Sequence, residues 1–288
     1  MIWLPLSFIS AFLSASIDAL TKHRFSRLRS FEMGAIGIIY TLPWLIAALF
    51  FIPWPTCDRM FFLALVCGLP LELLALVCYM RAIKISPLSL TLPFLAFTPL
   101  FMIVTGRLIL RESLTMPGIL GIILIVAGSY FLNFSHIKRG VLSPFNSILR
   151  EPGSRLMLFV AFIYSLTSSL GKLGVLHSSP PFFGTIYFIL LSLIMLFIMP
   201  LVPGAKMSSL VSKPFSALLI GALYAVMIFS HMLAISMVQA AYMISIKRTS
   251  LLFGVLYGAL LFKEERIAER LAGTAIMIGG VFVIGFLG

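Results

Sequence analysis

The chain consists almost entirely of apolar runs that are about as long as a membrane is thick. Residues 242–264 form one such run, and similar runs follow one another along the sequence. A helix needs about 20 apolar residues to cross the hydrocarbon core of a bilayer. Of the 288 residues, 61% are hydrophobic and 10% are charged, whereas a soluble domain has about 25% charged residues. The sequence therefore predicts an all-α integral membrane protein with no large soluble domain.

Ten runs are long enough to be read as transmembrane helices. They cover residues 4–20, 33–52, 60–80, 88–110, 117–134, 156–176, 182–202, 215–237, 242–264 and 271–287. Pro93 and Pro99 lie inside the fourth run, where proline indicates a kink or a break. The longest polar stretch, residues 135–154, separates the first five runs from the last five. The expected units are therefore residues 1–134, a connecting loop at 135–154, and residues 155–288.

The two halves of the chain resemble each other at a nearly constant offset. A shift of 152 positions aligns identical residues without a gap: Gly106, Glu112, Gly121 and Gly128 fall on Gly258, Glu264, Gly273 and Gly280. A shift of 153 aligns the first run with the sixth. Each half holds five spans, and five is odd, so the second half enters the membrane from the opposite side. The sequence predicts two inverted-topology five-helix repeats, a plan of secondary transporters whose site lies near the midplane between the repeats.

Positive charge is concentrated in alternate loops. Most Lys and Arg residues follow odd-numbered spans, and the loops after even-numbered spans hold only Arg59 and Arg111. Membrane proteins keep Lys and Arg in cytoplasmic loops. We therefore expect a multi-pass protein of the cell inner (plasma) membrane, with both termini outside the cytoplasm. The same asymmetry accounts for the formal net charge of +12 without any binding of nucleic acid.

Two adjacent cations, Lys247 and Arg248, lie within the ninth span. A cation at the centre of a spanning helix costs ~3 kcal/mol on insertion scales, so such charges face a protein interior, a water-filled cavity or an anionic ligand. Arginine offers a planar fork for carboxylate or phosphate, and lysine adds a compact charge. Successive helical residues point about 100° apart, so we expect a wide cavity that binds an anionic solute. The alternative is that Glu72 or Asp18 neutralises the pair and holds the halves together.

Two further ionisable residues have two interpretations each. Lys172 lies toward the outer end of the sixth span, where it either joins the site or extends to the membrane surface. Glu72 lies in the middle of the third span. It is either a carboxylate that couples transport to protons or the counter-ion of Arg248.

The remaining polar candidates lie in the first and eighth spans and after the fourth. Asp18 is expected to pair with Lys22, four residues further along the helix, and a counter-ion role is its alternative. Tyr224 and His231 are available in the eighth span, although a single histidine is more often a hydrogen-bonded packing residue. Glu112 and its repeat equivalent are expected to brace the turn that follows the helix.

The repeat carries a recognisable signature. Residues 258–266 read Gly-Ala-Leu-Leu-Phe-Lys-Glu-Glu-Arg, and Gly273, Gly279 and Gly280 follow in the last span. With the gapless copy in the first half, this sequence resembles the EamA-like branch of the drug/metabolite transporter (DMT) superfamily over nearly the whole chain. The resemblance implies ten helices in two inverted repeats around a central cavity, working by alternating access. Members move amino acids, sugars, nucleotide sugars and phosphorylated metabolites, so the resemblance does not select a substrate.

One local feature is similar to the plastid triose-phosphate translocator branch. There, an adjacent Lys-Arg pair in the ninth span binds the substrate's phosphate together with a lysine in the sixth span and a tyrosine in the eighth. Here Lys247 and Arg248 match the pair, and Lys172 lies in the sixth span. Tyr224 and His231 lie in the eighth span, although no motif matches either of them. The similarity implies a substrate-binding group made of these five residues.

Several function classes lack their motifs. The sequence has no HExxH, no serine-nucleophile motif paired with histidine and no aspartate dyad for an intramembrane enzyme, and no Walker loop for an ATP-driven pump. The cysteines, Cys57, Cys67 and Cys78, lack metal-ligand spacing. We therefore expect neither a metal nor a cofactor.

The sequence thus predicts a secondary transporter of a small anionic metabolite, phosphorylated metabolites included. Its expected partners are the solute, membrane lipids and a second copy of the chain, packed through the glycines of the fifth and tenth spans. These glycines fit packing within one bundle equally well. The alternatives are an exporter of amino acids or other metabolites and a lipid-phosphate flippase. An intramembrane enzyme or a channel fits the repeat and its charges less well.

Overall fold

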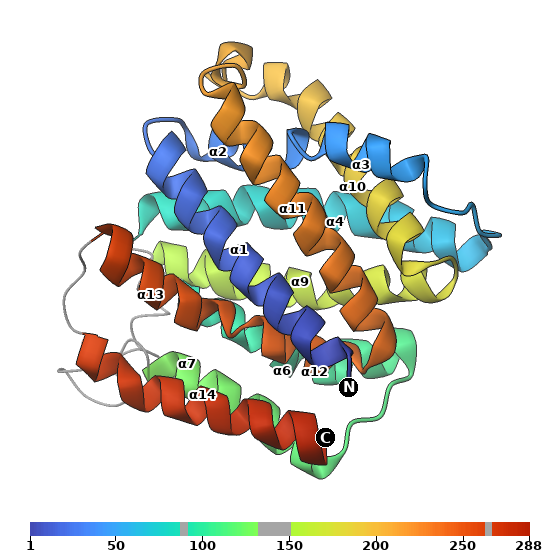
Figure 1. Ribbon diagram of the computed structural model, residues 1–288, viewed down its shortest axis with the longest axis vertical. Coiled ribbons are helices and arrows are strands. Elements are labelled where there is room, and N and C mark those ends of the chain that lie inside the picture. The colour runs from blue at the N-terminus through green and yellow to red at the C-terminus, as the bar shows by residue number, and fades with distance from the viewer. Residues whose placement is uncertain (87–91, 132–150, 263–266) are drawn as a thin grey trace.

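The computed structural model describes residues 1–86, 92–131, 151–262 and 267–288, in which helices joined by connecting segments are present and no strand is found. Figure 1 shows a helical bundle whose two termini lie at the same end. The first half contains α1 (Trp3–Phe25), α2 (Ser30–Ile39), α3 (Leu42–Leu49), α4 (Arg59–Ile85), η1 (Leu92–Phe97), α6 (Thr98–Leu110) and α7 (Met116–Phe131). The second half contains α9 (Pro152–Leu176), α10 (Pro180–Ile198), η3 (Met199–Leu201), η4 (Met207–Ser209), α11 (Pro214–Met237), α12 (Ala240–Lys247), α13 (Ser250–Phe262) and α14 (Ile267–Leu287).

Each of the ten expected runs contains helix. Within the described ranges, six segments are individually long and apolar enough to cross a membrane: Trp3–Phe25, Ser30–Leu49, Arg59–Ile83, Pro152–Leu176, Pro180–Leu201 and Pro214–Met237. Shorter apolar helices occupy Phe94–Leu110, Met116–Ser129 and Gly273–Leu287. The all-helical class is confirmed, and the count of ten spans stays a prediction. Residues 135–150 of the expected connecting loop and Glu264 lie outside the described residues.

Acidic residues cap two of the helices that begin earlier than their apolar runs. Glu151 accepts hydrogen bonds from the backbone N–H groups of Gly153 (3.2 Å) and Ser154 (2.6 Å), so α9 already starts at Pro152. Asp58 plays the same part for α4, because its carboxylate accepts from the N–H groups of residues 60 and 61. A side-chain acceptor at this position satisfies donors that have no partner within the helix.

Two expected spans are interrupted at equivalent positions. The ninth divides into α12 and α13 at Arg248–Thr249, and the fourth changes from η1 to α6 at Phe97–Thr98. A shift of 152 places Thr98 on Ser250, the first residue of α13. The backbone stays bonded through the later break, since Thr249 N donates to Ile246 O at 2.9 Å. The chain therefore passes through this interruption without leaving these N–H and C=O groups unpaired.

Helix packing follows the repeat. α4 packs along α9, and α1 packs along α11; the first span corresponds to the sixth and the third to the eighth, so the same contact is made twice. One side-chain hydrogen bond is also made twice, once in each half. Thr105 Oγ1 lies 3.3 Å from Ser169 Oγ. Tyr257 is the repeat equivalent of Thr105, and Ser16 is that of Ser169; Tyr257 Oη lies 2.7 Å from Ser16 Oγ.

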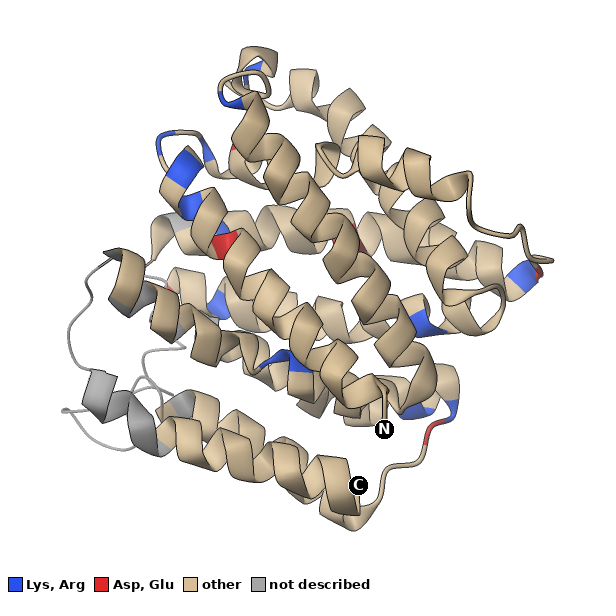
Figure 2. Ribbon diagram, viewed as in Figure 1, with Lys and Arg blue, Asp and Glu red and all other residues tan. Residues whose placement is uncertain are grey.

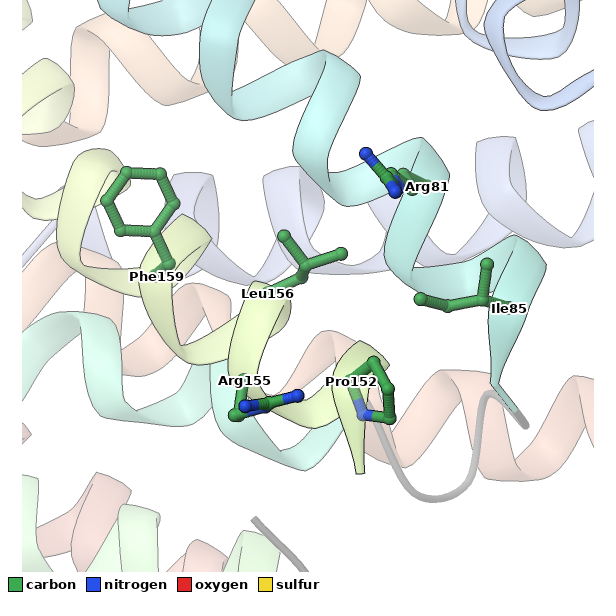
Figure 3. A pocket seen from close by; sticks show the side chains of 6 residues that line it. All are labelled: Arg81, Ile85, Pro152, Arg155, Leu156 and Phe159. Atoms are coloured by element: carbon green, nitrogen blue, oxygen red, sulfur yellow. The ribbon is translucent and has the colours of Figure 1, made fainter. Parts of the chain in front are cut away.

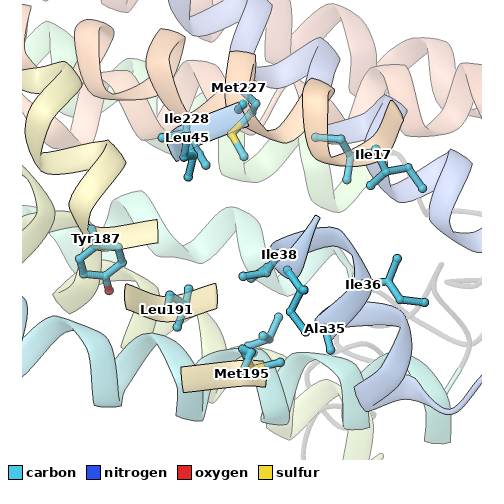
Figure 4. Packing of buried hydrophobic residues seen from close by; sticks show 14 of the residues in the cluster. Ile17, Ala35, Ile36, Ile38, Leu45, Tyr187, Leu191, Met195, Met227 and Ile228 are labelled. Atoms are coloured by element: carbon cyan, nitrogen blue, oxygen red, sulfur yellow. The ribbon is translucent and has the colours of Figure 1, made fainter. Parts of the chain in front are cut away.

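Apolar side chains fill the interior and also cover the outside. Figure 4 shows part of the largest buried cluster, which joins α1, α2, α3, α10 and α11 through residues such as Ile36, Leu191 and Ile228. On the outer surface, Phe50 is 83% exposed and Phe197 is 75% exposed. Contiguous apolar surface of this kind is rare on soluble monomers. It fits a bundle that is surrounded by lipid.

The glycines of α7 and α14 bring these two helices into backbone contact (Figure 1). A Cβ on Gly121 would lie 2.9 Å from Gly280 O, and one on Gly128 would lie 2.7 Å from Gly273 O. Small residues permit such close approach between membrane helices. The contact is made within one chain, so these glycine faces are not free for a second copy. The expected homodimer therefore has no assigned surface.

Gly128→Ala should lower the stability of the protein by about 1–3 kcal/mol, the usual cost of overpacking, because its methyl group would overlap Gly273 O. Gly279→Ala on α14 is the matched control, since nothing lies within 4 Å of its added Cβ. Alanine is the better helix former, so the control should be neutral or slightly stabilising. Thermal unfolding in detergent measures both. Equal stability of the two variants would contradict the close α7–α14 contact.

Candidate functional site

The interrupted helices meet at Arg248. Its Nη2 donates a hydrogen bond of 2.7 Å to Thr98 Oγ1, at the start of α6. The Thr98 hydroxyl in turn donates to Leu95 O at 2.7 Å. Arg248 Nε is buried and has no hydrogen-bond partner among the described residues. The guanidinium therefore joins the breaks of the two halves and keeps donor capacity to spare.

Lys247, at the end of α12, faces α11. Its Nζ lies 3.1 Å from His231 Nδ1 and 3.6 Å from Met227 Sδ. An ammonium group can only donate, so His231 accepts through Nδ1, and the ring hydrogen is assigned to Nε2. The structure thus brings together Lys247, Arg248 and His231, which the sequence places in two different spans.

Two carboxylates share the region of the two cations. Asp18 on α1 and Glu72 on α4 both interact electrostatically with Lys247. Thr167 of α9 also lies near Glu72. In the described ranges, neither carboxylate forms an ion pair within 4.0 Å of Lys247 or Arg248. The cations are therefore not locked onto the acidic residues in this conformation.

Three tyrosines complete the group. Tyr79 on α4 and Tyr164 on α9 lie close enough to Arg248 to interact with it electrostatically. Tyr224 on α11 interacts in the same way with Asp18 and Glu72. Sequence reasoning singled out Tyr224 but missed Tyr79 and Tyr164.

The repeat itself contains a signal for one of the missed tyrosines. A shift of 152 carries Tyr79 to His231, and it carries Glu72 to Tyr224. The group therefore uses the same two helical positions in each half. No comparable signal in the sequence points to Tyr164.

These side chains lie within the bundle and keep some accessible surface. Asp18 is exposed, and the other members are half-buried: Glu72, Tyr79, Tyr164, Tyr224, His231, Lys247 and Arg248. Charged groups inside a membrane protein are expected to face a water-filled cavity, a ligand or one another. Figure 2 shows that most other Lys and Arg residues lie at helix ends and in loops.

Lys172 lies in a different environment. Its side chain is buried, forms an ion pair with Glu112 and donates to Val238 O at 2.6 Å. Glu112 also accepts from the backbone N–H of Ala240 at 2.9 Å. Lys172 therefore neither extends to the membrane surface nor contacts the central group, and Glu112 braces the junction of α6, α9 and α12. Elsewhere in the described chain, no group of three His, Cys, Asp or Glu side chains could hold a metal ion.

Comparisons with known proteins identify the family and the fold. The model of the EamA-like transporter family matches residues 1–134 and 152–286. No individual curated protein matches the sequence. A solved structure titled "Crystal structure of protein" has a TM-score of 0.74 and 13% sequence identity, over 99% of this chain and 97% of that chain. At this identity the likeness shows the fold alone.

Cysteine labelling tests whether water reaches the central group. In a protein whose own cysteines (Cys57, Cys67 and Cys78) are replaced by serine, Glu72→Cys should react with a charged thiol reagent. Val66→Cys lies on the same helix, where the native side chain is 70% exposed on the apolar surface. This control should not react, because a charged reagent does not enter lipid. Equal labelling of both variants in liposomes, or none at Glu72→Cys, would show that water does not reach the group.

Proposed function

Because the chain belongs to the EamA-like transporter family, we propose that it carries a small anionic metabolite past Lys247 and Arg248. Family membership makes it a multi-pass membrane protein and a transporter of small molecules. The observation that carries the finer proposal is the state of the two cations. They lie within the bundle, are half-buried, and form no ion pair with the carboxylates in the described ranges.

The chemistry of the group favours an anion. A guanidinium has five N–H donors, and the contact with Thr98 occupies Nη2 while Nε has no described partner. Charge-assisted hydrogen bonds to carboxylate or phosphate are roughly twice as strong as neutral ones. An anion between Lys247 and Arg248 would offset their unfavourable burial. The half-exposed hydroxyl groups of Tyr79 and Tyr164 could donate further hydrogen bonds.

The repeated architecture supports alternating access. Two inverted five-helix repeats, residues 1–134 and 155–288, would each supply one interrupted helix to the site, as transporters of this plan do. The bond between Arg248 and Thr98 joins those interruptions. In the orientation expected from the loop charges, both termini lie outside the cytoplasm.

The buried Lys172–Glu112 pair is suited to closing one end of the path. It ties α9 of the second half to the end of α6 in the first half, and Glu112 also holds the first residue of α12. On the expected topology this end faces outward. His177 Nδ1 lies 2.6 Å from Asp58 Oδ2, in loops that the same topology places at that end. Opening toward the outside would require these links to separate.

A second candidate substrate class is zwitterionic, which would make the protein an amino-acid exporter. The observation that favours it is the presence of Asp18 and Glu72 beside Lys247. Together with Arg248, these residues carry formal charges that balance. A zwitterion would place its carboxylate on the cations and its ammonium group on the carboxylates.

Lys247→Ala and Arg248→Ala should each reduce solute uptake by proteoliposomes at least tenfold, since a hydrogen bond to a charged group contributes about 1.5–3 kcal/mol. The solute is first identified by thermal shift with phosphorylated, carboxylated and zwitterionic metabolites, because a ligand raises apparent stability by mass action. Arg59→Ala, at the far end of α4, is the control and should transport normally. Unchanged uptake by both site variants would remove the pair from the site.

The thermal-shift assay also separates the anionic from the zwitterionic substrate class. Asp18→Asn and Glu72→Gln each remove one negative charge. Binding of an anion should be unchanged or tighter in these variants, because a like charge is lost. Binding of a zwitterion should weaken, because the partner of its ammonium group is lost.

Removing one member of the Lys172–Glu112 pair should loosen the outer closure, because an unpaired buried charge costs about 3–5 kcal/mol. Lys172→Gln and Glu112→Gln should each increase the labelling of Glu72→Cys by an impermeant reagent added outside. The double variant Lys172→Gln/Glu112→Gln should show less than the sum of the two effects, since the partners are coupled. If Glu72→Cys is labelled at the same rate in the single variants as in the protein with an intact Lys172–Glu112 pair, the pair does not close the path.

A further inference from the structure

A shallow groove lies where the end of α4 meets the start of α9 (Figure 3). Its volume is about 410 Å³, and it is lined by Arg81, Ile85, Pro152, Arg155, Leu156 and Phe159. α4 belongs to the first half of the chain and α9 to the second, and the two helices pack along each other. The groove is therefore a surface feature of the contact between the halves, and it shares no residue with the central group.

The lining combines two cations with accessible apolar surface. Arg81 and Arg155 are both exposed, and each comes from a different helix. Ile85 is 50% exposed and Phe159 is 46% exposed. Because the groove lies at the ends of two apolar helices, it sits at the level where spanning helices meet lipid headgroups. Both helix ends adjoin loops that the charge pattern assigns to the cytoplasmic side.

The protein supplies no described counter-ion for these arginines. Glu151 is the nearest acidic residue in sequence, but its oxygens accept from the backbone of Ser154 and from the Ser86 hydroxyl. Partial burial raises the pKa of Glu151, yet the hydrogen bonds from Ser154 and Ser86 outweigh it and hold the pKa below its usual value. Glu151 is thus ionised and committed to the cap of α9. Within the described ranges, no carboxylate forms an ion pair with Arg81 or Arg155.

We propose that this groove binds the phosphate headgroup of an anionic phospholipid. The guanidinium groups of Arg81 and Arg155 hold the phosphate, which they can contact bidentately. Ile85, Leu156 and Phe159 contact the upper parts of the acyl chains. Basic pockets between membrane helices on the cytoplasmic side, where anionic lipids are enriched, suit such headgroups. A bound lipid would bridge the two halves and so stabilise the α4–α9 contact.

Lipid titration of the purified full-length protein in detergent tests this site. Phosphatidylglycerol should raise the unfolding temperature, because a ligand that binds the folded state stabilises that state. Phosphatidylcholine, which carries no net charge, should raise it much less. Arg81→Gln and Arg155→Gln should each weaken phosphatidylglycerol binding about fivefold, the effect of one interfacial cation. Arg81→Lys keeps the charge but loses the bidentate contact, so its affinity should lie between those of the unaltered protein and Arg81→Gln.

Two controls and one comparison make the test decisive. Arg27→Gln removes an exposed cation outside the groove and should leave the affinity unchanged; an equal loss there would show that general surface charge attracts the lipid. Equal stabilisation by the two lipids, or full affinity in both groove variants, would overturn the proposal. Inorganic phosphate at millimolar concentration should not reproduce the shift, and if it did so with the same dependence on Arg81, the groove would be a site for soluble phosphate.

Discussion

The bilayer offers no hydrogen-bond partner to a peptide group, and this constraint governs the whole molecule. Outside its connecting segments, the described chain is helical. The turn at Arg248–Thr249 is bonded within itself and is joined to α6 through Thr98. Once the backbone is satisfied in this way, the break can hold two cations at a depth where an unbroken, lipid-facing helix could not.

Much of the fold is readable from the sequence because lipid imposes a simple pattern. Every apolar run became helix, and Pro93 and Pro99 correctly indicated that the fourth run is interrupted. The break at Arg248 had no such marker, because neither proline nor glycine stands beside it. The early start of α9 was missed because an apolar count ignores the cap formed by Glu151.

The candidate site was only partly readable for a related reason. Charges in spans are rare, so Lys247, Arg248, Glu72 and Asp18 stand out in the sequence, and the structure places them around one region. Which charge touches which partner depends on contacts between distant segments. Lys172 meets Glu112 only because α9 crosses the end of α6, and no local pattern reports that crossing. Tyr164 looks like ordinary packing until its neighbours are known.

The two halves share a backbone plan but differ in chemistry at matching positions. Glu72 stands where the other half has Tyr224, and Tyr79 stands where the other half has His231. Two identical subunits around a two-fold axis would present the same groups twice and hold a guest in two equivalent poses. Divergence between the copies removes that degeneracy. Under the proposed function, a solute bound beside these residues would therefore meet different groups at its two ends, and this would give it a single preferred orientation.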